Sequence, residues 1–180
     1  MKNRNSALDT MIAGTFVVVA LLTSCKDQQG QSDLPSGPET SVAPEKGPAF
    51  TDPEADGEFN AYLQLKDALV ASDAKAAAVA AGWMRGHLGE DPLKAGEELA
   101  SIEESLDIER QRTWFAALND KMEAVLRDRL SSGTVYKQFC PMAFNNKGGY
   151  WFSDSETIRN PYFGDAMLNC GRVVEELAAR

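Results

Sequence analysis

The stretch LDIERQRTWFAALNDKMEAVLRDRL, residues 106–130, predicts the longest helix of this 180-residue chain. Its apolar residues recur at steps of three and four, which is the spacing of one face of an α-helix. The stripe consists of Phe115, Leu118, Met122, Val125 and Leu126. Gly133 follows shortly afterwards and is expected to stop the helix.

Three further helices are expected upstream of this one. The first begins near Glu58 and carries an apolar stripe from Phe59 to Val70. Ser72 is expected to cap the second, DAKAAAVAAGWMRGHL, whose alanines give it high helix propensity. The third runs through LKAGEELASIEES, with Pro92 at or near its start. Four amphipathic helices with short links predict a mainly α fold built as an antiparallel four-helix bundle.

The pattern changes after Gly133. TVYKQFCPMAF is β-prone, NNKGG is a turn signal, and YWFS follows as a second short strand. Together they predict a short β-hairpin, although Pro141 restricts the first strand to a sheet edge or an irregular loop. NPYFGDAMLNCG then predicts a small C-terminal helix, capped by Asn160 and stopped by Gly171.

The first 24 residues have the pattern of a signal peptide. Lys2 and Arg4 precede the apolar run Met11–Leu22, which is too short to span a bilayer comfortably. The run ends in LLTSC, which resembles the bacterial lipoprotein signal, so Cys25 is expected to be the lipidated first residue of the mature chain. The alternative is an ordinary secretory leader followed by a chance cysteine.

Composition divides the rest of the chain. Residues 25–57 are rich in Pro, Gly, Ser and acidic residues, which predicts a flexible linker. Residues 58–180 are expected to form a single helical domain, with a Cys/Met motif region at 134–175. The formal net charge is −9, and such an acidic chain without a basic run is not expected to bind nucleic acid.

No catalytic motif stands out, so the sequence predicts no catalytic residue and no enzyme. The chain has one histidine, and HExxH, GxSxG and P-loop patterns are absent from it. SDAK, Ser72–Lys75, matches the S-x-x-K of penicillin-binding enzymes, but their partner motifs are missing and a helix cap is the simpler interpretation. A nucleophile with its base cannot be assembled from these residues.

Four sulfur-bearing residues form two local pairs. Cys140 and Met142 are two apart, which places both side chains on one side of an extended segment. Met167 and Cys170 are three apart, which places them on one face of a helix. Two thiolates with one or two thioethers suit a soft cation, above all Cu(I) or Ag(I), better than zinc.

Other interpretations of these sulfurs remain open. In an oxidising compartment Cys140 and Cys170 could form a disulfide that closes a loop of about 30 residues and contributes about 3–4 kcal/mol. They could instead be free buried thiols, with the methionines filling gaps beside aromatic rings. A reversible dithiol that binds metal only when reduced lies between these cases. Met84 and His87, spaced i,i+3 on the second helix, are a weaker candidate metal pair.

A family resemblance accompanies these motifs. VYKQFCPMAFNNKGGYWFSDSETIRNPYFGDAMLNCG resembles the signature of the family of domain of unknown function 3347 (DUF3347), found in the envelope of Bacteroidota and some other Gram-negative bacteria. YLQLKDALVASDAKAAAVAA and DIERQRTWFAALNDKM resemble its helical half, so the resemblance covers about residues 58–175. The motif CPM is also similar to that of short heavy-metal-binding modules on efflux adaptors, which have histidine where this chain has Ala143.

The resemblance implies copper or silver handling, because the family occurs as stand-alone lipoproteins and fused to periplasmic adaptor subunits of heavy-metal efflux pumps. It implies a soft-metal site with Cys140 and Cys170 as thiolate donors and Met142 and Met167 as thioether donors. With the lipid anchor, it implies a periplasm-facing outer-membrane location and efflux adaptor components as partners. The alternative function is a non-metal structural or interaction lipoprotein stapled by a Cys140–Cys170 disulfide.

Overall fold

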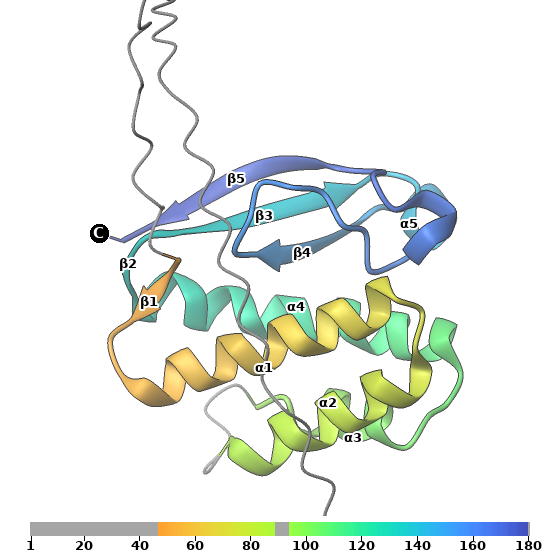
Figure 1. Cartoon of the computed structure of the whole chain (residues 1–180), viewed down its shortest axis with the longest axis horizontal. Coiled ribbons are helices and arrows are strands. Elements are labelled where there is room, and N and C mark those ends of the chain that lie inside the picture. Colours follow the sequence, from red (N-terminus) through yellow and green to blue (C-terminus); the bar gives the residue numbers. More distant parts are fainter. Residues whose placement is uncertain (1–46, 89–93, 180) are drawn as a thin grey trace, which may run out of the picture. The chain divides into compact units, whose positions relative to one another are not determined.

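The computed structural model describes residues 47–88 and 94–179 (Figure 1). The expected signal peptide, the lipidated Cys25 and the linker up to residue 46 lie outside the described residues. Within the described ranges, no helix is long and apolar enough to cross a membrane. The elements in chain order are β1 (Ala49–Phe50), α1 (Pro53–Val70), α2 (Ala74–His87), α3 (Gly96–Glu103), α4 (Ile108–Arg129), β2 (Leu130–Ser132), β3 (Thr134–Cys140), α5 (Ala143–Asn146), β4 (Gly149–Ser153), the 3-10 turn η1 (Gly164–Met167) and β5 (Arg172–Ala178).

Three of the helices begin at an aspartate. Asp52, Asp73 and Asp107 cap α1, α2 and α4, each accepting a hydrogen bond from a backbone N–H of the first turn. Ser72, the expected cap of the second helix, lies one residue too early and has a φ of 54°. A carboxylate at the cap satisfies free N–H groups and also interacts favourably with the positive end of the helix dipole.

The folded part begins earlier than the sequence indicated. The predicted linker extends to Gly57, but β1 pairs with β2 and α1 already begins at Pro53. Arg129 Nη2 donates to Asp52 Oδ1 at 2.7 Å, which ties the start of α1 to the end of α4. The proline and acidic residues of this stretch favour the start of a helix as much as they favour a linker, which is why composition alone misplaced the boundary.

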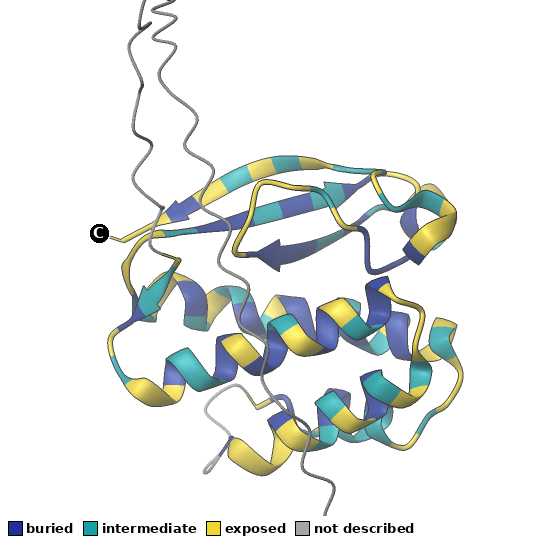
Figure 2. Cartoon of the chain, viewed as in Figure 1, coloured by how far each residue is buried: buried dark blue, intermediate teal, exposed yellow. Residues whose placement is uncertain are grey.

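The helices α1 and α4 lie between the larger sheet on one side and α2 and α3 on the other (Figure 1). The prediction of a mainly α fold holds, and α4 lies close to its expected bounds. A four-helix bundle followed by a hairpin is not confirmed, because a sheet packs against α4 and is hydrogen-bonded to α1. Figure 2 shows buried residues along both helices and along this sheet. The fully buried side chains at this centre include Tyr62, Leu65, Leu69, Phe115, Leu118, Met122, Trp151 and Phe152.

The larger sheet has three antiparallel strands in the order β4-β3-β5. The expected hairpin corresponds to β3 and β4, but the expected C-terminal helix is reduced to η1, and the chain after Gly171 forms β5. Val173 and Val174 are β-branched and fit a pleated strand better than a helix. The free edge of β3 supplies a partner that no local pattern reveals.

A buried polar network fastens the sheet to the helices. Tyr62 Oη on α1 donates to Asn119 Oδ1 on α4 at 2.6 Å and accepts from the N–H of Phe152 at 2.9 Å. Asn119 Nδ2 in turn donates to Tyr162 Oη at 2.9 Å and to the carbonyl of Tyr150 at 2.7 Å. The network joins α1, α4, β4 and the segment before η1 at one point in the core, so it fixes the sheet end that carries the sulfur residues.

Candidate functional site

The structure brings Cys140 and Cys170 together. Cys140 is the last residue of β3 and is fully buried, whereas Cys170 lies just before β5 and is partly exposed. Both cysteines are free, and their Sγ atoms lie 3.0 Å apart. Thirty residues of chain, including β4 and η1, form the loop between the two thiols.

Asn160 holds the segment that carries Cys170. This fully buried side chain donates from Nδ2 to the carbonyl of Cys170 at 2.8 Å and accepts at Oδ1 from the N–H of Tyr162 at 2.8 Å. Its backbone N–H donates to the carbonyl of Leu168, and its backbone carbonyl accepts from the N–H of Gly164. The residue that the sequence marked as a helix cap therefore organises an irregular loop around one buried amide.

The close approach of this loop to the sheet requires Gly171. Its φ is 152°, and a Cβ there would lie 3.0 Å from the Trp151 ring and 3.1 Å from the carbonyl oxygen of Phe139. A larger residue would push the loop off the sheet and carry the neighbouring Cys170 away from Cys140.

The 3.0 Å distance between the two Sγ atoms is longer than in a disulfide and shorter than in a metal site. A disulfide bond is about 2.05 Å long, so closing the pair takes about 1 Å. A zinc–thiolate bond is about 2.3 Å long, so two sulfurs on one ion lie about 3.8 Å apart at a tetrahedral angle and about 4.6 Å apart in line. The pair therefore needs to open by about 0.8 Å or more to hold a metal ion between its sulfurs.

The contact also affects protonation. The neighbouring Cys140 thiol, followed by burial, raises the pKa of the Cys170 thiol above its ordinary value. The Cys170 sulfur is thus held as a neutral thiol near neutral pH. It must lose its proton before it joins a disulfide or a metal complex.

Met142 lies in a constrained turn after β3. Phe144, Asn145 and Asn146 have φ values of 52°, 58° and 66°, so three consecutive residues other than glycine adopt the left-handed conformation. Such residues cost about 1–2 kcal/mol each, which the turn offsets by burying Ala143 and packing Phe144 edge-on against Tyr162. The turn leaves Met142 45 % exposed.

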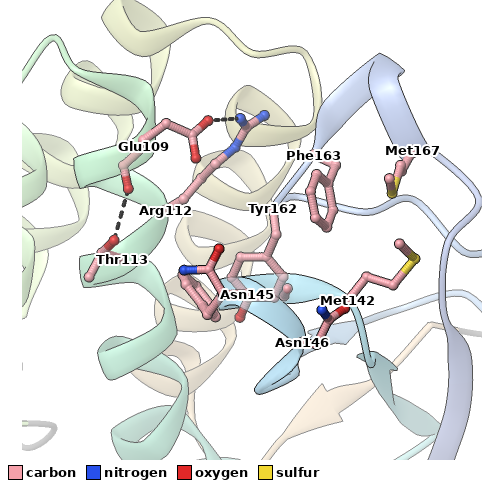
Figure 3. A pocket seen from close by; sticks show the side chains of 11 residues that line it. Glu109, Arg112, Thr113, Met142, Asn145, Asn146, Tyr162, Phe163 and Met167 are labelled. Atoms are coloured by element: carbon pink, nitrogen blue, oxygen red, sulfur yellow. Dashed lines mark hydrogen bonds and ion pairs between the residues drawn. The ribbon is translucent and has the colours of Figure 1, made fainter.

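A cleft of about 450 Å³ lies beside this turn (Figure 3). Met142 and Met167 both line it, whereas neither cysteine does. The four sulfurs therefore do not all line one cleft. They form a thiol pair in contact and a thioether pair on the cleft. The remaining lining residues are Glu109, Arg112, Thr113, Ala143, Phe144, Asn145, Asn146, Tyr162 and Phe163.

Arg112 forms part of the opposite wall and joins three segments. Its Nε donates to the carbonyl of Pro161 at 2.9 Å and its Nη2 to Ser72 Oγ at 2.9 Å. Its Nη1 donates to Glu109 Oε1 at 2.6 Å (Figure 3). Sequence inspection missed both this arginine and Asn119. The available signal was their position, because both fall on the apolar face of α4 at helical spacing from Phe115.

The weaker candidate pair on α2 does not face a common space. Met84 is buried in the core. His87 is exposed, donates from Nδ1 to the carbonyl of Trp83 at 2.8 Å, and packs its ring on that indole at 4.0 Å between centroids. Among the described residues there is no group of three or more His, Cys, Asp or Glu side chains that could hold a metal ion.

The helical layer matches a known family. The family described as "Protein of unknown function (DUF3347)" matches residues 59–132. The resemblance to this family is confirmed over these residues. The match runs from α1 to β2 and stops before the Cys/Met motif region. No curated protein and no solved structure matches the chain.

Proposed function

We propose that the chain is a lipid-anchored envelope protein that binds a soft monovalent cation, Cu(I) or Ag(I), through Cys140 and Cys170. The observation that carries this proposal is the 3.0 Å contact between two free thiols that are thirty residues apart. Its role is to buffer the metal or to pass it on to efflux adaptor components. The proposal assigns no catalytic residue to the chain.

The donor set favours a monovalent soft ion over zinc. Two thiolates suit the low coordination number and the softness of Cu(I) and Ag(I). A structural zinc site needs four ligands of the Cys, His or carboxylate type, and the described part of the chain groups no three of these. Each of the two thiols gives its proton to solvent as its metal–sulfur bond forms, so one ion bound releases two protons.

Proton release makes the affinity depend on pH. The raised pKa of the Cys170 thiol means that protons compete with metal throughout the neutral range. The apparent affinity is expected to rise with pH, by up to about a hundredfold per unit while both thiols are protonated in the free protein.

A direct test is a Cu(I) competition titration against bathocuproine disulfonate. The reduced full chain is used in detergent without oxygen. Wild type should bind one equivalent, and both Cys140→Ser and Cys170→Ser should lose it. A Cys25→Ser chain is the matched control and should bind as wild type does. Equal binding by wild type and the Cys140→Ser and Cys170→Ser variants would overturn the proposal.

The second candidate is a structural or interaction lipoprotein stapled by a Cys140–Cys170 disulfide. The specific observation in its favour is that the sulfurs are closer than a bridging ion allows. Bond formation releases two protons and gives two electrons to an oxidant of the compartment. Intact-mass analysis after thiol labelling of protein taken from its own envelope separates the two candidates. A pair that is fully oxidised and resists mild reductant supports the staple.

A further inference from the structure

The two methionines of the cleft come from facing segments. Met142 belongs to the turn after β3, and Met167 is the last residue of η1. Figure 3 shows their thioether ends on the same side of the cleft, turned toward one another. The distance along the chain from each methionine to its neighbouring cysteine is short, but the cysteine thiols lie outside the cleft lining.

The exposure of Met142 distinguishes this pair from ordinary core packing. Met84 and Met122 are buried in the hydrophobic core, whereas Met142 is 45 % exposed. The left-handed turn of Phe144, Asn145 and Asn146 fixes the backbone that displays it. The left-handed conformation, which most residues avoid, thus accompanies an apolar thioether held at the surface.

The chemistry of the two sulfur pairs differs in one respect that matters for uptake. A thioether carries no proton and is a neutral, soft ligand, so a monovalent soft cation binds it without displacing anything from the protein. Cys140 is fully buried and Cys170 is only partly exposed, and neither thiol lines the cleft. A cation arriving from solvent therefore meets a ready ligand pair at the cleft before it reaches the thiols.

We infer that Met142 and Met167 form a second site for a soft monovalent cation, separate from the thiol pair, which captures the ion at the cleft. This inference rests on the proposed function for its role, since the captured ion is delivered to Cys140 and Cys170. The binding itself does not require the thiols. The site is weaker than the thiol pair, exposed and insensitive to pH.

The test uses silver nitrate as the probe and methionine oxidation as the readout. The full chain carrying Cys140→Ser and Cys170→Ser, with Cys25 alkylated, is treated with hydrogen peroxide in chloride-free buffer. Peptide mass spectrometry follows the sulfoxides. Silver should slow oxidation of Met142 and Met167 at least fivefold, equally at pH 5.5 and pH 7.5.

A matched variant tests whether the two thioethers act together. Met167→Leu keeps the size and apolar character of the side chain, so the turn and the cleft should persist. Silver should then no longer protect Met142. Protection of Met142 that is unchanged by Met167→Leu, or no protection in the thiol-free chain, would overturn the inference.

The two proposals fail separately. Loss of Cu(I) binding at the thiols with methionine protection intact would remove the proposed function and leave the cleft site. In the chain with intact thiols, Met142→Leu with Met167→Leu should slow silver loading at least fivefold and leave its final stoichiometry at the thiols unchanged. An unchanged loading rate would show that the cleft is not the route of capture.

Discussion

The buried amide of Asn160 donates to the backbone carbonyl of Cys170 at 2.8 Å, while its oxygen accepts from the N–H of Tyr162. One side chain thus joins the two ends of the segment that contains η1. Because Cys170 contacts Cys140 only while this segment is in place, the thiol contact depends on an amide that bonds to the backbone of Cys170.

Replacing Asn160 with alanine should therefore loosen the thiol pair. The free energy of unfolding should fall by about 1–3 kcal/mol, because buried backbone groups lose their partners. Urea denaturation measures this loss, and the rate of maleimide labelling at Cys170 should rise at the same time. Asn169→Ala, at an exposed position next to Cys170, is the control and should stay within about 0.5 kcal/mol of wild type. A wild-type labelling rate in Asn160→Ala would show that the amide does not position Cys170.

Oxidation of the thiol pair should stabilise the fold. A disulfide across thirty residues is expected to raise the free energy of unfolding by about 3–4 kcal/mol, because it constrains the unfolded chain. Chemical denaturation before and after treatment with oxidised glutathione measures the difference. Cys170→Ser treated in the same way should show no change. An oxidised wild type no more stable than the reduced one would mean that closing the pair distorts the loop around Asn160.

The sequence predicted the presence of the helices, because their apolar stripes are local, but it misplaced the cap of α2 by one residue. The apolar stripe of α4 followed from residues within one or two turns of each other. The expected stop at Gly133 was wrong, because α4 already ends at Arg129 and Gly133 lies between β2 and β3. The strand β5 could not be found in this way, since it depends on the edge of β3, more than thirty residues earlier.

The four candidate sulfur ligands fall into two pairs for a similar reason, because their predicted pairing depended on where β3 and η1 end. The rule that residues two apart share a side holds only while a strand continues, and β3 ends at Cys140, so Met142 already belongs to a turn. Met167 and Cys170 would share a face of a helix, but η1 ends at Met167. Both predicted pairs required β3 and η1 to extend a few residues further than they do. Tertiary contacts set where such elements end, and the local sequence does not show them.

Gly148→Ala should destabilise the fold strongly. Gly148 has a φ of 85°, and a Cβ there would lie 2.4 Å from the ring of Phe139. Backbone strain and displacement of the ring together predict a loss of about 2–4 kcal/mol. Gly86→Ala on α2 is the matched control, because a Cβ there meets nothing within 4 Å, and it should stabilise by up to about 1 kcal/mol. Thermal unfolding of the two variants beside wild type checks the contrast, which equal melting temperatures would contradict.

Alkaline pH should weaken the interface between sheet and helices. Burial raises the pKa of Tyr62 well above its ordinary value of 10.0, and it also raises the pKa of Tyr150 and Tyr162. Below pH 10 these hydroxyls are neutral in both the folded and the unfolded chain, so they do not make the free energy of unfolding depend on pH. Above pH 10 the unfolded chain loses protons first. The free energy of unfolding should then fall by about 1.4 kcal/mol per pH unit for each such tyrosine.

Tyr62→Phe separates the contribution of one hydroxyl from the rest. At pH 7 the variant should be less stable by about 1–3 kcal/mol, because Asn119 Oδ1 and the N–H of Phe152 lose their buried partner. Above pH 10 the unfolded wild type ionises at Tyr62, whereas the variant has no hydroxyl there to ionise. The difference in free energy of unfolding between wild type and variant should therefore shrink by about 1.4 kcal/mol per pH unit. Urea denaturation of both proteins at pH 8, 10, 10.5 and 11 measures the difference. A difference that stays constant across this range would mean that Tyr62 ionises as readily in the folded chain as in the unfolded one, and that the polar network at the centre of the fold is open to water.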